Sequence, residues 1–358
     1  MISFVWSPGK RLPAGTGGSE NYTVGQVREL NRRGIPAQVV TIGLGIADGR
    51  EEFWDIPFRS VSTVPDLTRL DGTLVFVSDA PVVATKNPAY QMLHVPPPIR
   101  TRHHDLTIEA TRDRSLIAPS RYAASLWAAF LDVDVATIAV VYPFAERVFA
   151  AQPRKPSDLR STRILYAGRL SPEKGIYTLL EMLHVDLIDD DPSLSFTVTT
   201  AGSDKRQGRI IQTLVEAHPG VSVVPAQRSP AAMAALMADH DIVVMPSTSK
   251  YWHETFGIVS IEAQHTGCRV VASDDGGIPE TDCGAVLLVE PDNAEALAVG
   301  LRAAILAGPV SETLRARAAT RFTVAASVDS LLDVLAGPRS PTPAEIIRDL
   351  EAMVEVVG

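Results

Sequence analysis

The sequence predicts an α/β protein with two parallel-sheet domains. Short apolar runs, typical of strands buried on both faces, alternate with stretches of helical periodicity along most of the chain. This pattern restarts after residues 151–161, a segment rich in proline and polar residues. The length of 358 residues also exceeds the usual size of a single core. We therefore expect two doubly wound domains with a cleft between them.

Composition limits the class of protein and its partners. The net charge is −9, and residues 1–150 carry 15 Lys or Arg and 15 Asp or Glu, so no basic surface for nucleic acid is predicted. No apolar run approaches the roughly 20 residues that cross a bilayer, and the first ten residues do not resemble a signal peptide. A cytoplasmic location is expected. Cys268 and Cys283 suggest buried small side chains, and no metal site is predicted.

The first half opens with a strand at 2–6, a helix at 19–33 and a strand at 37–42. Ser19 is a suitable N-cap for that helix, and Gly34 a suitable stop. Gly15, Gly17 and Gly18 occupy the turn between strand and helix, where doubly wound sheets bind ligands. A plain glycine-rich turn explains the same residues equally well, so these glycines alone do not identify a binding site.

His94 lies near the carboxyl end of another predicted strand of the first half. The strands expected there span 73–78, 90–95, 115–120 and 139–143. The carboxyl edge of a parallel sheet is where such proteins keep their sites. A hydrogen-bonded core histidine is the alternative, and without other evidence it is the commoner case.

The second half repeats the alternation of strands and helices. Its strands are expected at 163–167, 195–202, 221–224, 241–245, 268–273 and 285–290, with a helix at 176–184 after the first of them. Helical segments at 321–337 and 343–357 follow, and these can return across the linker to the first domain. The expected division of the chain is therefore 1–153, 160–320 and 321–358.

Two carboxylates mark the most informative stretch of the second half. Glu254 lies in the loop after the strand 241–245, and Glu262 lies more than a turn inside the following helix, 257–266. Glu262 projects from the apolar side of that helix, where an unpaired carboxylate costs several kcal/mol. The start of the helix offers backbone N–H groups and a partial positive charge, which suit a phosphate. A ligand with both hydroxyl and phosphate groups would satisfy the two requirements.

Two further loops of the second half can reach the same edge. Arg169 and Lys174 follow the strand at 163–167, and a guanidinium with an ammonium suits a diphosphate. Gly276 and Gly277 follow the strand at 268–273 and would let the backbone approach a ligand closely. The carboxyl ends of parallel strands bring such loops together.

The order of these segments resembles the retaining glycosyltransferases of family 4, which have the GT-B fold of two Rossmann-like domains facing a central cleft. Residues 163–290 match well, and the first half matches more loosely at GGSE (17–20), LHVPP (93–97) and APS (118–120). The segments that carry the resemblance are GRLSPEKG (168–175), AG (201–202), PS (246–247), HETFGIVSIEAQHTGCRVVAS (253–273) and GGIPE (276–280). The spacing from Glu254 to Glu262 is the Glu-x7-Glu signature of that family.

The resemblance implies a role for each matching residue. Arg169 and Lys174 would bind the donor diphosphate and stabilise the leaving group, Glu254 would contact the donor sugar, and Glu262 would accept hydrogen bonds from the ribose. From the first domain, Gly17 and Gly18 would close on the donor and His94 would lie near its sugar. The implied catalytic residues are Arg169, Lys174, Glu254 and His94. The implied donor-binding residues also include Gly168, Gly202, Arg228, Thr255, Phe256, Gly257, Ile258 and Val259.

The implied activity is transfer of a sugar from a nucleotide diphosphate sugar to an acceptor hydroxyl. Family 4 enzymes retain the anomeric configuration by front-face attack without a divalent metal, so no cofactor is expected. A UDP-sugar is favoured over a GDP-sugar as donor, and the neutral first half slightly favours a small soluble acceptor. Two alternatives stay open: a nucleotide-sugar epimerase of the same architecture, and a non-catalytic sugar-binding protein.

Overall fold

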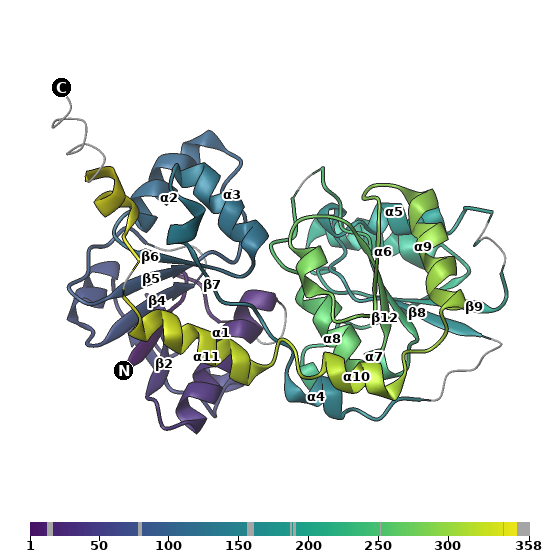
Figure 1. Ribbon diagram of the computed structural model, residues 1–358, viewed down its shortest axis with the longest axis horizontal. Helices are drawn as coiled ribbons and strands as arrows, with labels where there is room; N and C mark the ends of the chain where they lie inside the picture. Colours follow the sequence, from purple (N-terminus) through teal and green to yellow (C-terminus); the bar gives the residue numbers. More distant parts are fainter. Residues whose placement is uncertain are drawn as a thin grey trace. The chain divides into compact units, whose positions relative to one another are not determined.

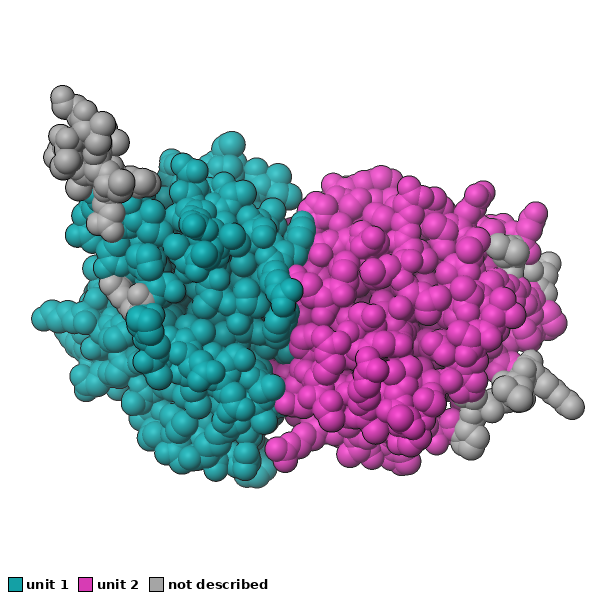
Figure 2. Space-filling model, in the orientation of Figure 1, with its two compact units in different colours: residues 1–143, 324–358 teal, residues 144–323 magenta. Residues whose placement is uncertain are grey.

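The computed structural model describes residues 1–12, 17–77, 81–155, 161–186, 188, 191–250, 252–338 and 340–348. These form two compact units, shown in separate colours in Figure 2. Unit 1 comprises the described residues of 1–143 and 324–358, and unit 2 those of 144–323. The chain thus leaves unit 1 after Pro143 and returns to it at Val324, whereas the sequence expectation puts these boundaries at 153–160 and 320–321.

Unit 1 contains a parallel sheet. In its described part, seven strands lie in the order β3-β2-β1-β4-β5-β6-β7, the doubly wound arrangement that reverses direction beside β1. The strands are β1 (Ile2–Val5), β2 (Ala37–Ile42), β3 (Phe58–Val61), β4 (Thr73–Val77), β5 (Ala89–Met92), β6 (Ser115–Ala118) and β7 (Ala139–Val140). Side chains of β1, β2 and β4 such as Val5, Val40 and Phe76 are buried in one apolar cluster, which agrees with the continuous apolar runs of these strands.

Helices complete unit 1 (Figure 1). They are α1 (Gly18–Arg32), α2 (His104–Thr111), α3 (Arg121–Leu131) and α11 (Val324–Ala336), with short 3-10 turns η1 (Arg50–Glu52), η2 (Val64–Arg69), η3 (Thr101–His103) and η4 (Val135–Thr137). The prediction of Ser19 as the N-cap of α1 is wrong. Gly17 is the extended cap residue, without a side-chain hydrogen bond, and Ser19 already lies in the first turn, where its carbonyl accepts a hydrogen bond from Thr23 Oγ1 at 2.8 Å.

Helix α11 is part of unit 1, although it follows unit 2 in the sequence, and it lies against α1. Ser327 on α11 joins it to two other segments of the unit. Its hydroxyl donates to the carbonyl of Tyr142 at 2.6 Å and accepts from the side-chain amide of Gln26, on α1, at 2.9 Å. Arg33, at the end of α1, forms an ion pair with Asp329. These contacts join α1 to α11, and a further helical segment, 343–348, follows in the described part of the unit.

Unit 2 contains the second parallel sheet. In its described part, six strands lie in the order β10-β9-β8-β11-β12-β13. They are β8 (Thr162–Tyr166), β9 (Leu194–Thr199), β10 (Val221–Val224), β11 (Ile242–Met245), β12 (Arg269–Ser273) and β13 (Val286–Val289). The helices are α4 (Arg147–Ala151), α5 (Ile176–Met182), α6 (Arg206–Glu216), α7 (Pro230–Ala238), α8 (Ile258–Thr266), α9 (Ala294–Leu306) and α10 (Glu312–Ala318), with 3-10 turns η5 (Pro172–Lys174) and η6 (Ile278–Thr281).

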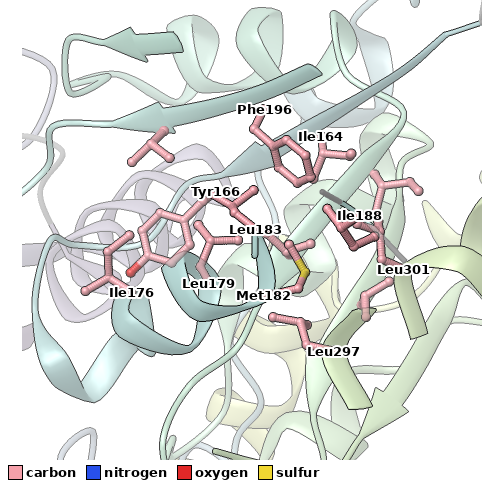
Figure 3. Close-up of a cluster of buried hydrophobic side chains, with 14 of the residues drawn as sticks. Ile164, Tyr166, Ile176, Leu179, Met182, Leu183, Ile188, Phe196, Leu297 and Leu301 are labelled. Carbon is pink, nitrogen blue, oxygen red and sulfur yellow. The ribbon is translucent and has the colours of Figure 1, made fainter. Parts of the chain in front are cut away.

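The main apolar core of unit 2 lies between β8, β9, α5 and α9 (Figure 3). Ile164 and Phe196 of the sheet lie in one cluster with Leu179 of α5, Leu183 directly after α5, and Leu301 of α9, and all five are buried. This core fixes where β8 ends and α5 begins, and therefore fixes the loop between them. Within the part of the chain that the structure describes, no helix is long and apolar enough to cross a membrane.

Candidate functional site

The strand order of unit 2 places its switch point between β8 and β11. Chain connections run to β9 on one side of this point and to β12 on the other. The loops that follow β8 and β11 therefore diverge at the carboxyl edge and leave a crevice, where open α/β sheets bind ligands. The two most informative stretches of the sequence, 168–175 and 246–257, are these two loops.

Tyr166, the last residue of β8, shapes the loop that carries the two expected cations. Its ring packs in the apolar core beside Ile176 and Leu179 (Figure 3). Its hydroxyl lies 2.8 Å from the carbonyl oxygen of Arg169 and 3.2 Å from that of Lys174. Burial raises the pKa of this phenol well above its usual value, so it stays a hydrogen-bond donor. One buried hydroxyl thus fixes the backbone beside both cations.

The loop after β8 also packs tightly against the loop after β11. Gly175 has a φ of +69°, and a Cβ at this position would lie 1.5 Å from the carbonyl oxygen of Pro246. Only glycine allows both the positive φ and this close approach. The backbone N–H of Thr248 donates to the carbonyl of Glu173 at 3.2 Å. The loops after β8 and β11 are therefore fixed relative to each other.

Lys174 and Glu254 meet across these loops. The Lys174 ammonium forms an ion pair and hydrogen bond with the Glu254 carboxylate, whose side chain is 12% exposed. Ser247 donates to the same carboxylate oxygen at 3.0 Å. Burial acts to raise the pKa of Glu254, but the charge and hydrogen bond of Lys174, with smaller effects of Ser247 and Arg169, outweigh it and lower the pKa. Glu254 is therefore ionised at neutral pH.

The N-terminus of α8 is open to an anion. Gly257 precedes the helix in a left-handed conformation, with φ of +105°, and no side chain caps the helix. The first turn begins with Ile258 and Val259, and the N–H of Ser260 is the one bonded back to Gly257, at 3.0 Å. Backbone N–H groups at such a terminus, with the helix dipole, suit a phosphate.

Glu262 lies one turn further along α8 and is buried, with 9% of its surface exposed. No hydrogen bond to its carboxylate is found among the described residues, although buried polar groups normally have partners. Burial, with a smaller effect from the negative charge of Glu146, raises its pKa from 4.5 to about 8. A ligand hydroxyl would satisfy this carboxylate.

Gly276 and Gly277 serve a different purpose from the one expected. The sequence suggests that they give a ligand room, but the space beside them is occupied by the backbone of Glu254 and Thr255. A Cβ at Gly276 would lie 2.2 Å from the carbonyl oxygen of Glu254, and one at Gly277 would lie 2.4 Å from that of Thr255. The N–H of Gly277 donates to the Glu254 carbonyl at 2.7 Å. These glycines therefore hold the loop after β11 in place.

The remaining expected residues of unit 2 lie around the same edge. Gly202 follows β9, where the Ala201 carbonyl accepts from the N–H of Leu170 at 2.7 Å. Phe256 is buried against Phe322, with ring centroids 5.4 Å apart. The others are Gly168, directly against the Tyr166 ring, the partly exposed Thr255, and the exposed Arg228 in the loop after β10. Their roles as donor-binding residues stay predictions.

The expected residues of unit 1 lie at the carboxyl edge of its own sheet. His94 follows β5, and its ring meets that of Tyr22 edge to face, with centroids 4.7 Å apart. Burial lowers the pKa of His94 to about 4, so its imidazole is neutral at pH 7. Gly17 and Gly18 lie at the start of α1, and Gly15 lies outside the described residues. Whether these three described residues act on a donor stays a prediction.

Several residues that organise the site were missed by sequence reasoning. Tyr166 and Ser247 adjoin the motif residues, and a search for polar groups at the ends of β8 and β11 could have found them. His253 and Asp275 form a hydrogen bond of 2.6 Å, but they lie 22 residues apart, and no periodicity indicates such a pair.

Comparison with known proteins adds independent support. Residues 161–306 match the family model for glycosyl transferases group 1. D-inositol 3-phosphate glycosyltransferase of Streptomyces griseus is 32% identical over 225 residues, which cover 54% of this chain and 46% of that protein. The Segniliparus rotundus enzyme of the same name is 29% identical over 270 residues, which cover 70% and 58%. The chain thus spans about half the length of these curated relatives.

Solved structures resemble the chain over nearly its whole length. A glycosyltransferase from Rickettsia africae has a TM-score of 0.71 and 16% identity, with 93% of this chain and 97% of that one covered. Anabaena HepE in complex with UDP and glucose has a TM-score of 0.71 and 19% identity, with 94% and 99% covered. The predicted GT-B fold is confirmed by these neighbours. Residues 161–306 are therefore similar to the glycosyl transferases group 1 family, and the chain has the GT-B fold, which confirms the resemblance to family 4 glycosyltransferases.

Proposed function

We propose that this protein is a retaining glycosyltransferase that moves a sugar from a nucleotide diphosphate sugar to an acceptor hydroxyl without a divalent metal. The observation that carries the proposal is the arrangement at the carboxyl edge of unit 2. There Lys174 is paired with the buried Glu254, and the uncapped start of α8 lies on the same loop as Glu254. Cation, helix N-terminus and carboxylate match phosphate and hydroxyl groups of one ligand.

The diphosphate and the ribose of the donor would each find partners in this arrangement. The diphosphate would take the N–H groups of Gly257, Ile258 and Val259 together with Arg169 and Lys174. Arg169 is 47% exposed and its ion pair with Glu173 is long, at 3.3 Å, so it can turn to a phosphate at little cost. The ribose hydroxyls would donate to Glu262, which has no other donor among the described residues.

The chemistry that these residues supply is stabilisation of the leaving group. When the bond between the anomeric carbon and the phosphate oxygen breaks, negative charge grows on the diphosphate. Lys174 and Arg169 offset that charge, and their backbone is already fixed by Tyr166, so little reorganisation is needed. The acceptor hydroxyl attacks from the same face and passes its proton to the departing phosphate. Glu254 holds the sugar hydroxyls and does not need to act as a nucleophile.

A UDP-sugar is the donor that we favour, and a small soluble polyol the acceptor. The neighbouring HepE structures contain UDP, and relatives are named for the acceptor D-inositol 3-phosphate, so both choices have support from similar proteins. The balanced charge of residues 1–150 is compatible with such an acceptor. We place the reaction in the cytoplasm, as expected from the sequence.

The proposal is tested first by binding and then by turnover. Thermal shift with UDP, GDP and ADP should show stabilisation by UDP. UDP-sugars are then incubated with the protein and with inositol 3-phosphate, in EDTA, and the products are followed by NMR. Transfer or slow hydrolysis with retained configuration supports the proposal. Inverted product, or conversion of the donor sugar to its epimer, contradicts it, and dependence on an added metal contradicts the metal-free mechanism.

Lys174→Ala should lower turnover by two orders of magnitude or more. The change removes the ammonium that offsets charge on the leaving diphosphate and leaves Glu254 buried with Ser247 as a remaining donor. Steady-state kinetics with the best donor measure the effect. Lys205→Ala is a suitable control, because Lys205 is an exposed residue before α6. If the Lys174 variant and wild type had equal turnover, the proposed role of Lys174 in stabilising the leaving group would be wrong.

A further inference from the structure

The residue before Glu254 takes part in a second polar contact that the proposed function does not use. His253 Nδ1 lies 2.6 Å from Asp275 Oδ1. His253 is partly exposed, while Asp275, in the loop after β12, has 6% of its surface exposed. The second oxygen, Asp275 Oδ2, is buried and has no hydrogen-bond partner among the described residues. Among the described residues, His253 is thus a side-chain hydrogen-bond partner of this buried carboxylate, through Oδ1.

The direction of this hydrogen bond fixes the imidazole. An ionised carboxylate only accepts hydrogen bonds, so the proton lies on Nδ1 of His253. A buried carboxylate that orients an imidazole through Nδ1 is a common supporting arrangement at functional sites. Here it joins the loop after β11 to the loop after β12 through side chains.

The same two loops are joined through their backbones one residue later. The N–H of Gly277 donates to the carbonyl of Glu254 at 2.7 Å, and the glycines at 276 and 277 leave no space between the loops. The backbone of Glu254 is therefore held on the side of β12. Its side chain is held on the opposite side, by Lys174 of the loop after β8 and by Ser247. The position of the Glu254 carboxylate depends on both attachments.

We propose that His253 and Asp275 form a positioning pair that holds Glu254 in place for the donor sugar. The inference rests on the proposed function, since it concerns the sugar end of the same donor site. His253 acts through Glu254 and contacts no reacting atom in this proposal. The nucleotide end, formed by Arg169, Lys174, the start of α8 and Glu262, has an attachment of its own, because the Tyr166 hydroxyl holds the backbone beside both cations.

Because the pair acts at the sugar end, a change at His253 should affect turnover of the nucleotide sugar more than affinity for the nucleotide. His253→Ala removes the donor to Asp275 and frees the loop, so kcat for UDP-glucose hydrolysis or transfer should fall about tenfold or more. Its affinity for UDP, measured by calorimetry, should stay within about threefold of wild type. His218→Ala, at a partly exposed histidine after α6, serves as the matched control and should change neither quantity.

Two conservative variants separate positioning from other roles. In His253→Asn the amide nitrogen occupies the place of Nδ1 and can donate to Asp275, so kcat should recover to within about threefold of wild type. In His253→Gln the nitrogen lies one bond further out, at the place of Nε2, and kcat should stay low. Recovery in Gln but not in Asn would mean that the Nε2 edge acts directly, which overturns the proposal.

Other outcomes are equally informative. If His253→Ala keeps the kcat of wild type, or loses UDP affinity as much as turnover, the pair is not a positioning device for the sugar end. A melting temperature measured for each variant identifies general unfolding, and recovery in Asn at an equal melting temperature excludes it as the cause. If wild type uses another nucleotide sugar and not UDP-glucose, the variants are compared with that donor and its nucleotide. If wild type binds no nucleotide at all, the proposed function itself is rejected.

Discussion

Glu262 lies in an environment that does not favour an ionised side chain. Burial and the charge of Glu146 raise its pKa from 4.5 to about 8, and no described group donates a hydrogen bond to it. Between those two pH values the folded protein holds a proton that the unfolded chain releases. Stability contributed by this group is therefore complete below about pH 4.5 and is lost as the pH rises to 8.

Glu262→Gln tests this linkage, because glutamine imitates the protonated carboxyl at every pH. The melting temperature of wild type relative to Glu262→Gln should fall between pH 5.5 and 8, with a free-energy change of at most about 1.4 kcal/mol per pH unit. Differential scanning calorimetry at four pH values measures it. A difference that is flat with pH, or that grows with rising pH, would show that Glu262 is ionised in the folded protein.

Tyr166 gives a second test at the scale of one residue. Tyr166→Phe removes the hydroxyl that lies near the carbonyls of Arg169 and Lys174 and leaves the ring in the core. The lost hydrogen bond costs roughly 1 kcal/mol of stability, but kcat/KM for the donor should fall about tenfold because both cations lose their fixed backbone. Tyr177→Phe, at an exposed tyrosine of α5, is the control. Equal kinetics of the two variants would contradict a role for the Tyr166 hydroxyl.

At the scale of elements, the junction of the loops after β8 and β11 is the tightest contact of the site. Gly175 and Gly308 have nearly equal φ values, +69° and +67°, but a Cβ at Gly175 meets the Pro246 carbonyl at 1.5 Å, whereas a Cβ at Gly308 meets nothing within 4 Å. The two glycines thus differ in packing and not in backbone strain.

This pair allows a matched experiment. Gly308→Ala should cost about 1 kcal/mol, the usual penalty of a positive φ for alanine. Gly175→Ala should cost at least about 2 kcal/mol more, because the backbones of the two loops must separate, and it should weaken UDP binding about tenfold or more. Chemical denaturation and calorimetry give both quantities. Equal stability losses would mean that the loop junction adapts without cost.

The elements that the sequence predicts well are those with a continuous apolar run or a clear helical stripe. The strand expected at 241–245 is β11, Ile242–Met245, and all four of its residues are buried. By contrast β3, Phe58–Val61, went unpredicted because it pairs only with β2 and alternates in exposure. Four residues with one buried side chain give no detectable pattern.

In the candidate site too, the sequence predicts the residues of local motifs but not the contacts between loops. Glu254, Glu262, Arg169 and Lys174 were identified from local motifs, and the structure brings Lys174 and Glu254 together. The room predicted beside Gly276 is filled by the protein's own backbone, which no local pattern reveals. Contacts between loops depend on strand order, and strand order is a property of the whole sheet.

At the scale of the whole molecule, the proposed site residues are shared between the two units, and this allows a test of the proposed donor site. Arg169, Lys174, Glu254 and Glu262 all belong to unit 2, a continuous segment of the chain, whereas Gly17, Gly18 and His94 belong to unit 1. The isolated segment 144–323 should therefore bind UDP within about tenfold of the affinity of the full chain, and should show no turnover.

Calorimetry on the segment measures the affinity, and circular dichroism confirms that it is folded. The same segment with Lys174→Ala is the control and should bind UDP more weakly. A folded segment that does not bind UDP would show that the nucleotide end of the site needs residues of unit 1.

The return of the chain to unit 1 at Val324 has a consequence for biosynthesis. Helix α11 lies against α1 and joins Gln26 and Tyr142 through Ser327, yet it is translated after all of unit 2. On the ribosome, unit 2 is therefore the first of the two whose described elements are all available, and the face of α1 that α11 contacts stays uncovered until the chain beyond residue 323 has been made. Nascent chains that stall before residue 324 would display that face to chaperones, although every described element of unit 2 is already present.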